Sequence, residues 1–269
     1  MDAKIDLSTP QGFRQAVRAG DIAGPTAGLV PGRVQANLVI LPEEHASDFL
    51  EFCRRNPKPC PVLEITRPGN PEPSRTAPGS DLRTDVPRYR VFVDGRLHAE
   101  PTDIIDIWRE DLVAFLLGCS FTFEHALLGA EIPVRHLEER RNVPMFITSH
   151  RCNPAGGFSG PLVVSMRPIP AHLVERAVEI TSRYPHSHGA PVHVGFPEKI
   201  GINDPARPDF GDAVSIKEGE VPVFWACGVT PQMVLMEARL PIAITHYPGH
   251  MFVTDLSEFE TFEETALLE

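Results

Sequence analysis

Residues 221–246 read VPVFWACGVTPQMVLMEARLPIAITH, and this stretch decides the fold class. The run from Val221 to Gly228 is apolar and ends at a glycine, which is typical of a buried strand. Pro231 then stands at the first position of a helix that ends at Arg239, and the apolar strand IAITH follows. Strand–helix–strand order favours a parallel pair of strands. The chain is therefore predicted to form a three-layer α/β domain with a mixed sheet.

The stretch before this one indicates a second, smaller unit. It contains strands at 145–150 and 161–169, a helix at 172–184 and a strand at 192–196. A β-β-α-β order suits a two-layer α+β subdomain. We therefore predict an α+β subdomain at 143–205, inserted into a discontinuous α/β domain made of residues 1–142 and 206–269.

The first 142 residues are predicted to alternate helices and strands. Helices are expected at 8–20, 43–56, 103–117 and 122–128, strands at 33–42, 60–66 and 88–95, and a proline-rich loop at 67–81. In the third helix, Ile104, Ile107, Trp108, Leu112 and Phe115 recur at the spacing of one helix face. Each of these helices is expected to bury one apolar stripe.

Composition limits the classes of function. The net charge is −11 at pH 7, so binding to a nucleic-acid backbone has no electrostatic support. The five cysteines form no CxxC motif, which excludes a zinc knuckle and a dithiol redox motif. The chain opens without a signal-peptide pattern, and no apolar run is long enough to span a bilayer. We expect reduced thiols in a cytoplasmic protein that does not bind membranes. The oligomeric state stays open, and a homo-oligomer is one alternative.

Cys227 is the first candidate for chemistry. It stands at the end of the predicted strand, and Thr230 and Pro231 then begin a helix whose free N–H groups face the space beyond the strand. Such a helix start, including Gln232, is expected to hold a carboxylate and to lower the pKa of a nearby thiol. A buried cysteine that only fills space fits the same position equally well.

A second candidate is the break between two apolar helices at GCSFTFEHAL, residues 118–127. Cys119 and Glu124 lie there in apolar surroundings, which would raise the pKa of the carboxyl group and suit it to acid–base work. The alternative is a solvated glutamate in the first turn of a helix, where the helix dipole favours it.

The loop CNPAGGFSG at 152–160 is rich in glycine. Backbone N–H groups around Asn153, Gly156 and Gly157 are expected to form a nest for a carboxylate, and a simple wide loop is equally consistent. The loop lacks the GK[ST] ending of a P-loop, and no nicotinamide, flavin or nucleotide motif occurs elsewhere. No cofactor is therefore predicted.

Basic and histidine side chains supply further candidates. Arg83 and Arg88, which follow the proline-rich loop, are expected to clamp a substrate carboxylate, although surface solvation is the default for a single arginine. His186 and His188 follow a predicted helix, and His246 and His250 flank a Pro-Gly turn. These histidines are a possible metal site, but their spacing matches no tight metal motif, so no metal is predicted.

Several of these stretches together resemble one family. GLVPGRVQANLVILP, DLRTDVPRYRV, GCSFTFEHAL, CNPAGGFSGPLVVSMRP, VFWACGVTPQ and THYPGHMFVTD are similar to the bacterial "putative hydro-lyase" family, also named for D-glutamate cyclase. The resemblance spans roughly Pro10 to Leu256. It implies a lyase that acts on a small carboxylic or amino acid and cyclises D-glutamate to 5-oxo-D-proline with loss of water.

That reaction needs a base for the ammonium group, an acid for the departing oxygen and anchors for a carboxylate. Cys227 and Glu124, with Cys119, are the predicted acid–base groups, and His188 or His250 is expected to assist them. The predicted anchors are Thr230, Gln232, Asn153, Gly156, Gly157 and Arg83. Two other readings stay open: a non-catalytic module that binds a small acid, and a metal-dependent lyase or hydrolase built on the histidines.

Overall fold

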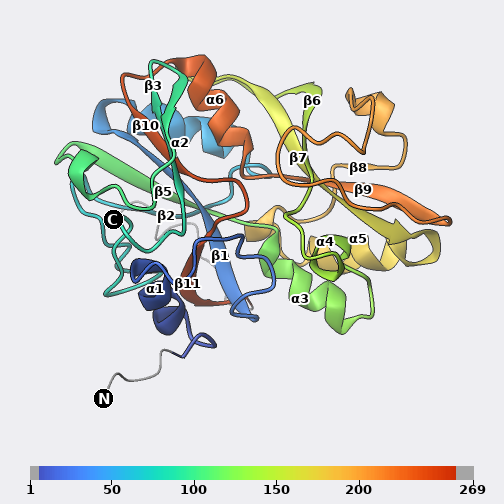
Figure 1. Ribbon diagram of the computed structural model, residues 1–269. Coiled ribbons are helices and arrows are strands. Elements are labelled where there is room, and N and C mark those ends of the chain that lie inside the picture. Colours follow the sequence, from blue (N-terminus) through green and yellow to red (C-terminus); the bar gives the residue numbers. More distant parts are fainter. Residues whose placement is uncertain (1–5, 259–269) are drawn as a thin grey trace.

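Two antiparallel sheets organise the chain in the computed structural model, which describes residues 6–258 (Figure 1). The larger sheet has the order β2-β5-β1-β10-β3-β4, and β11 also pairs with β1. Its strands are β1 (Arg33–Pro42), β2 (Val62–Ile65), β3 (Tyr89–Val93), β4 (Arg96–Ala99), β5 (Leu112–Gly118), β10 (Ala243–His246) and β11 (Phe252–Ser257). The smaller sheet has the order β6-β7-β9-β8. Its strands are β6 (Met145–Arg151), β7 (Pro161–Pro170), β8 (His193–Val194) and β9 (Glu220–Ala226).

The helices are mostly short. The α-helices are α1 (Pro10–Arg18), α2 (Ala46–Arg55), α3 (Phe121–Gly129), α4 (Arg135–Glu138), α5 (Val174–Ser182) and α6 (Thr230–Ala238). The 3-10 turns are η1 (Glu43–His45), η2 (Ile105–Ile107), η3 (Ala171–Leu173), η4 (Pro185–Ser187) and η5 (Pro197–Ile200). Helix α1 begins as its sequence predicts, because the Thr9 hydroxyl accepts a hydrogen bond from the Gly12 amide at 3.1 Å.

Alternation along β1 divides the larger core into two layers. Val39 and Leu41 pack with residues of α2 and α6 on one face of the sheet, and Leu38 and Ile40 pack on the other face against the long connection between β2 and β5. In the smaller sheet, α3 and α5 cover one face around Trp225 (Figure 1). The predicted α/β class is confirmed.

The predicted parallel pairing is wrong. Strands β9 and β10 flank α6 in sequence but belong to different sheets, and β9 pairs antiparallel with β7 and β8. The smaller sheet therefore draws a strand from residues 220–226, beyond the predicted insertion. The division into residues 1–142 plus 206–269 and an insertion at 143–205 stays a prediction.

The predicted helix over 103–117 is also wrong. Apart from the short turn η2, this stretch forms β5, and all seven residues of that strand are buried. Strand β5 lies between β1 and β2 in the sheet, and its alternate side chains pack into the two core layers, so both of its faces are covered. A strand buried on both faces has a continuous apolar run, which carries no alternation to distinguish it from a buried helix.

Candidate active site

The candidate site lies where β1 changes its neighbour along one edge. Residues 39–40 of β1 pair with β10, and residues 35–36 pair with β11, so Asn37 and Leu38 stand between the two. The buried Asn37 amide donates to the Gly118 carbonyl at 2.7 Å, which ties β1 to the end of β5. Gly228, just after β9, packs directly on Asn37, since a Cβ there would lie 2.0 Å from Asn37 Cγ. Ends of strands from both sheets therefore meet at Asn37.

A buried charge cluster lies beside this junction. One oxygen of Glu124, Oε1, accepts from Arg167 Nε at 2.9 Å, also contacts Arg167 Nη2, and lies 3.0 Å from His136 Nε2. Arg167 also donates to Ser120 Oγ at 3.0 Å and Ser165 Oγ at 3.1 Å. Both charged side chains are at most 2% exposed. Within residues 6–258, Glu124 Oε2 has no hydrogen-bond partner.

Glu124 is not the neutral acid that its apolar sequence context predicts. Burial alone would raise the pKa of this carboxyl group, but the charges of His136 and Arg167 outweigh burial and hold the pKa below its ordinary value. The guanidinium of Arg167 lies 5.2 Å from the ring centroid of Phe123 and 5.4 Å from that of Trp225. These aromatic contacts add to its stabilisation.

Cys119 and Cys227 lie together in one apolar cluster with Val163, Met145 and Val229. Cys227 is 8% exposed, so its sulfur does not face the open hollow that its sequence position predicts. Burial raises the pKa of Cys227 to about 11 and raises that of Cys119 further. The expected lowering of the thiol pKa is therefore wrong. At neutral pH both groups are therefore protonated.

His188 is brought to the same region by η4. The η4 backbone packs on the end of β5, since a Cβ at Gly118 would lie 1.6 Å from the His186 carbonyl oxygen. His188 Nδ1 lies 2.6 Å from the Lys58 carbonyl oxygen, which can only accept, so Nδ1 carries the hydrogen. Nε2 then presents a lone pair, and this buried atom has no hydrogen-bond partner in the described part of the chain. Burial lowers the pKa of His188 to about 4, and the nearby charge of Arg167 acts in the same direction.

His246 has the opposite arrangement. His246 Nδ1 lies 3.0 Å from the Leu38 amide nitrogen and 3.3 Å from the Leu38 carbonyl oxygen. The amide contact is the shorter one and its N–H is directed at Nδ1, so Nδ1 accepts and Nε2 carries the hydrogen. Burial lowers the pKa of this imidazole to about 3, which keeps it neutral. Among residues 6–258, its buried Nε2 is also without a hydrogen-bond partner. The junction therefore contains one imidazole that can accept a proton and one that can donate a hydrogen bond.

Thr230 and Gln232 lie at the junction, but their side chains make hydrogen bonds that hold neighbouring backbone in place. Thr230 is the first residue of α6 and not its N-cap, because its hydroxyl accepts from the Val163 amide at 3.0 Å. Gln232 donates to the His246 carbonyl at 2.9 Å. The Thr230 and Gln232 amides donate to backbone carbonyls of residues 227 and 229, so the helix start is partly satisfied internally.

The other predicted anchors make their contacts elsewhere. The Asn153 amide donates to Asn56 Oδ1 at 2.8 Å, and Gly156 packs on Asp48 of α2. Gly157, which follows Gly156, is exposed. Arg83 is paired with Asp81 at 2.8 Å. None of these contacts joins the glycine-rich loop or Arg83 to the cysteine pair.

The histidine loops do not form a metal site in the described residues. His250 donates towards the Pro248 carbonyl at 3.1 Å and stacks edge-on against Tyr247. Within residues 6–258 no three His, Cys, Asp or Glu side chains are grouped so that they could hold an ion. The same region contains no helix long and apolar enough to cross a bilayer.

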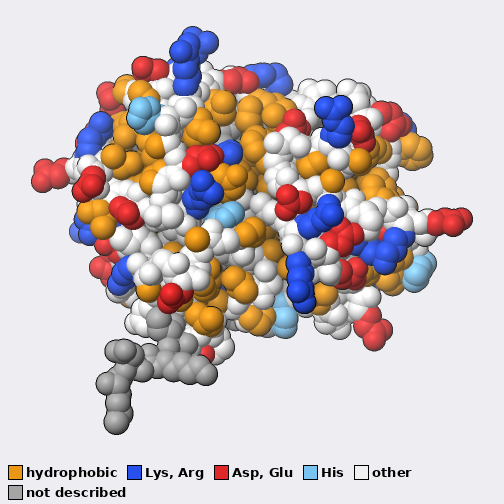
Figure 2. Space-filling view, in the orientation of Figure 1, with side chains coloured by type: hydrophobic (Ala, Val, Ile, Leu, Met, Phe, Trp, Pro, Cys, Tyr) orange, Lys and Arg blue, Asp and Glu red, His pale blue; other side chains and the backbone are white. Residues whose placement is uncertain are grey.

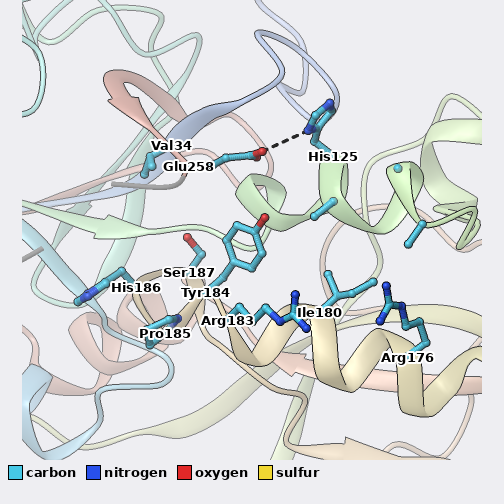
Figure 3. A pocket seen from close by; sticks show the side chains of 13 residues that line it. Val34, His125, Arg176, Ile180, Arg183, Tyr184, Pro185, His186, Ser187 and Glu258 are labelled. Atoms are coloured by element: carbon cyan, nitrogen blue, oxygen red, sulfur yellow. Dashed lines mark hydrogen bonds and ion pairs between the residues drawn. The ribbon is translucent and has the colours of Figure 1, made fainter. Parts of the chain in front are cut away.

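A hollow of about 700 Å³ lies between α3 and α5 (Figure 3). Ser187 and Pro185 of η4 form part of its wall, and Tyr184 points its hydroxyl towards the buried carboxylate of Glu258. Glu258 Oε1 lies 3.2 Å from His125 Nδ1. Ser187, the chain neighbour of His188, lines this hollow, whereas His188 itself is 1% exposed.

Sequence reasoning missed three residues of the site, Asn37, His136 and Arg167, and considered His246 only as a possible metal ligand. Their signals were weak. Arg167 interrupts the apolar strand LVVSMRPI, and a charge inside a buried strand requires a buried partner. Asn37 likewise interrupts VQANLVIL. Neither interruption identifies the partner.

Comparison with known proteins assigns the family. The family described as D-glutamate cyclase matches residues 113–255, more than half of the chain. A protein of Rubrobacter xylanophilus named "putative hydro-lyase" is 65% identical over 247 residues, covering 92% of this chain and 95% of that protein. The chain belongs to the D-glutamate cyclase family. The matched span contains Glu124, Arg167, His188, Cys227 and His246.

Other members of the family match over similar lengths. A "putative hydro-lyase" of Stutzerimonas stutzeri is 60% identical over 258 residues, covering 96% of this chain and 97% of that protein. Among solved structures, the chain is similar to a nitrogen repressor-like protein of Methanococcus jannaschii, with a TM-score of 0.38 and 10% identity over 95% of this chain and all of the other. That structural similarity is too low to inform function.

Proposed function

We propose that the protein is a hydro-lyase for a small carboxylic or amino acid, and that it cyclises D-glutamate to 5-oxo-D-proline and water. The observation that carries the proposal is His188 Nε2, a buried, neutral proton acceptor beside Arg167 with no hydrogen-bond partner in residues 6–258. A cyclisation that begins from an ammonium group needs such a base. The names of the relatives agree with the reaction class.

In the proposed reaction, His188 Nε2 removes a proton from the ammonium group, and the amine attacks the side-chain carboxyl carbon. A C–N bond forms and a C–O bond breaks. The nitrogen loses two protons in all, and the departing oxygen gains two and leaves as water, so no net proton is taken up. The protonated thiols of Cys119 and Cys227 are the proposed acids, and His246 Nε2–H is the proposed donor to the oxygen that becomes negative.

The test is turnover of D-glutamate, followed as 5-oxoproline by chiral chromatography, with L-glutamate as the stereochemical control. His188→Asn keeps a donor near the position of Nδ1 and removes Nε2. Asparagine also tolerates the left-handed backbone of this residue, whose φ is 76°. We expect kcat to fall about 100-fold or more. The matched control is His172→Asn at an exposed site, which should leave kcat unchanged.

Each result has a defined meaning. Unchanged turnover in His188→Asn would remove His188 as the base. Binding of D-glutamate without product, measured by calorimetry, would favour the non-catalytic binding module. Dehydration of another small acid without cyclisation of D-glutamate would leave the reaction class standing and overturn the substrate.

A further inference from the structure

His188 lies on a short segment that borders the hollow between α3 and α5. We call residues 185–190 the histidine strap, which consists of the turn η4 and the three residues that follow it. Pro185 and Ser187 of the strap line the hollow (Figure 3). His188 itself is buried, and its Nε2 has no hydrogen-bond partner among residues 6–258. The strap therefore separates the proposed base from the hollow.

The backbone of the histidine strap turns sharply at His188. His188 and Gly189 both have a positive φ, 76° and 65°, and a residue with a side chain adopts this left-handed region at a cost. The amides of Ser187 and Gly189 both donate to the Tyr184 carbonyl at 2.9 Å. Such a turn persists where the surrounding structure holds it in place.

Gly118, the last residue of β5, supports the strap at η4. A Cβ at Gly118 would lie 1.6 Å from the His186 carbonyl oxygen and 2.8 Å from its carbonyl carbon. Two backbone segments can approach this closely because glycine has no side chain. Gly118 is itself fixed, since its amide donates to the Pro61 carbonyl at 2.9 Å and its carbonyl accepts from Asn37. Any side chain at position 118 would therefore displace the strap.

Lys58 holds the other end of the strap. Its Nζ donates to the Ala190 carbonyl at 2.7 Å, and its own carbonyl accepts from His188 Nδ1 at 2.6 Å. Burial lowers the pKa of His188, the bond to the Lys58 carbonyl opposes this, and the charges of Arg167 and Lys58 lower the pKa again. Lys58 thus influences the course of the strap, the orientation of the imidazole and its charge.

We propose that Gly118 and Lys58 are positioning residues for His188, which hold the histidine strap closed and keep Nε2 in place and shielded from the hollow. This inference rests on the proposed function, in which His188 is the base. Figure 2 shows acidic and basic side chains over α4 and α5, and α5 borders the hollow. If the strap loosened, water from this surface would reach the imidazole and stabilise its charged form.

The first test observes the imidazole directly and needs no turnover. Protein with isotope-labelled histidine is titrated by NMR, and the signal absent from His188→Asn is assigned to His188. In the wild type this imidazole should stay neutral at pH 5, because its pKa is about 4. In Gly118→Ala its pKa should move towards 6.5, since the methyl group displaces the strap. Gly129→Ala, where an added methyl group has open space, is the matched control and should leave the titration unchanged.

Lys58→Met is the milder variant, and it decides the proposal if Gly118→Ala does not fold, which thermal unfolding monitors. It keeps the carbonyl that accepts from His188 and removes the ammonium group. We expect a smaller upward shift of the His188 pKa, and Lys58→Arg, which keeps a charged donor, should restore the wild-type titration. Lys217→Met, at an exposed lysine outside the strap, is the matched control and should have no effect.

The second test separates positioning from charge. D-glutamate turnover is measured at pH 8, where His188 is neutral in every variant, so loss of the Lys58 charge alone does not lower kcat. A displaced base should lower kcat about tenfold or more in Gly118→Ala and about threefold in Lys58→Met. KM should change little, because neither residue is proposed to touch the substrate.

The outcomes distinguish this inference from the proposed function. If the wild type forms no product, the proposed reaction fails, and the NMR titration still decides whether the two residues hold His188. An unchanged titration in Gly118→Ala or in Lys58→Met overturns the role of the residue that was changed. A shifted titration with wild-type kcat at pH 8 overturns positioning and leaves shielding alone. Loss of turnover in His188→Asn but not in the two strap variants leaves the proposed base standing without them.

Discussion

Glu124 and Arg167 show what a single buried residue pair does for this protein. Each charge has lost its hydration, so the pair is tolerated only because Glu124 Oε1 contacts both Arg167 and His136 and Arg167 also donates to Ser120. Removing one partner leaves the other charge buried without compensation. The pair therefore restricts how α3 can pack against β7 more than an apolar contact would.

We predict that Glu124→Gln lowers the free energy of unfolding by about 3–5 kcal/mol, because Arg167 is left uncompensated. Urea unfolding followed by circular dichroism measures the change. The matched control is Glu179→Gln, whose exposed carboxylate pairs with Arg176 and should contribute almost nothing. A double variant, Glu124→Gln with Arg167→Met, should recover much of the loss. Equal effects of Glu124→Gln and Glu179→Gln would contradict the prediction.

At the scale of elements, the sequence predicts strands and helices well where caps or turn residues mark their ends, and poorly where a buried apolar run resembles a helix face. Helix α1 and strands β6 and β7 lie close to their predicted ranges, because caps and apolar runs bounded by turns identify them. Strand β5 was mistaken for a helix because it is covered on both faces. The sheet that β9 joins could not be predicted, since pairing depends on contacts between distant residues.

The junction of β9 and α6 yields a prediction of its own. Gly228 has no space for a side chain, because Asn37 Cγ would lie 2.0 Å from its Cβ. We expect Gly228→Ala to destabilise the fold by about 1–3 kcal/mol through overpacking and to disturb Asn37. Gly129→Ala, at a helix position with open space around the added methyl group, should instead raise the melting temperature slightly. Thermal unfolding compares the two. A Gly228→Ala protein as stable as the wild type would show that Asn37 can move.

At the scale of the whole molecule, the site is assembled from elements of both sheets. Cys119, Glu124, His188 and Cys227 are sequence-predicted residues, and each lies within or beside one buried region around Arg167. Their residue types were visible in the sequence, but their protonation states were not. Burial makes the thiols weaker acids and the imidazoles weaker bases, and a sequence gives no measure of burial by distant elements.

This arrangement predicts how stability depends on pH. In the folded protein, burial holds the pKa of His188 at about 4 and that of His246 at about 3, against 6.5 for an ordinary histidine. Between pH 6.5 and 4 the unfolded chain therefore binds more protons than the folded one, so the free energy of unfolding falls as the pH falls. At pH 4 each histidine accounts for a loss of about 3 kcal/mol, and above pH 7 the loss vanishes.

Urea unfolding at pH 7, 6, 5 and 4 measures this dependence. His188→Asn should reduce the loss of stability at pH 4 by about 3 kcal/mol, because asparagine does not titrate, and His246 and His250, whose pKa values burial also lowers, should keep the rest of the slope. The exposed His172→Asn should leave the slope unchanged. If His188→Asn keeps the full wild-type slope, the imidazole is protonated in the folded protein at a pH near its ordinary pKa. It would then not be the buried neutral base on which the proposed reaction depends.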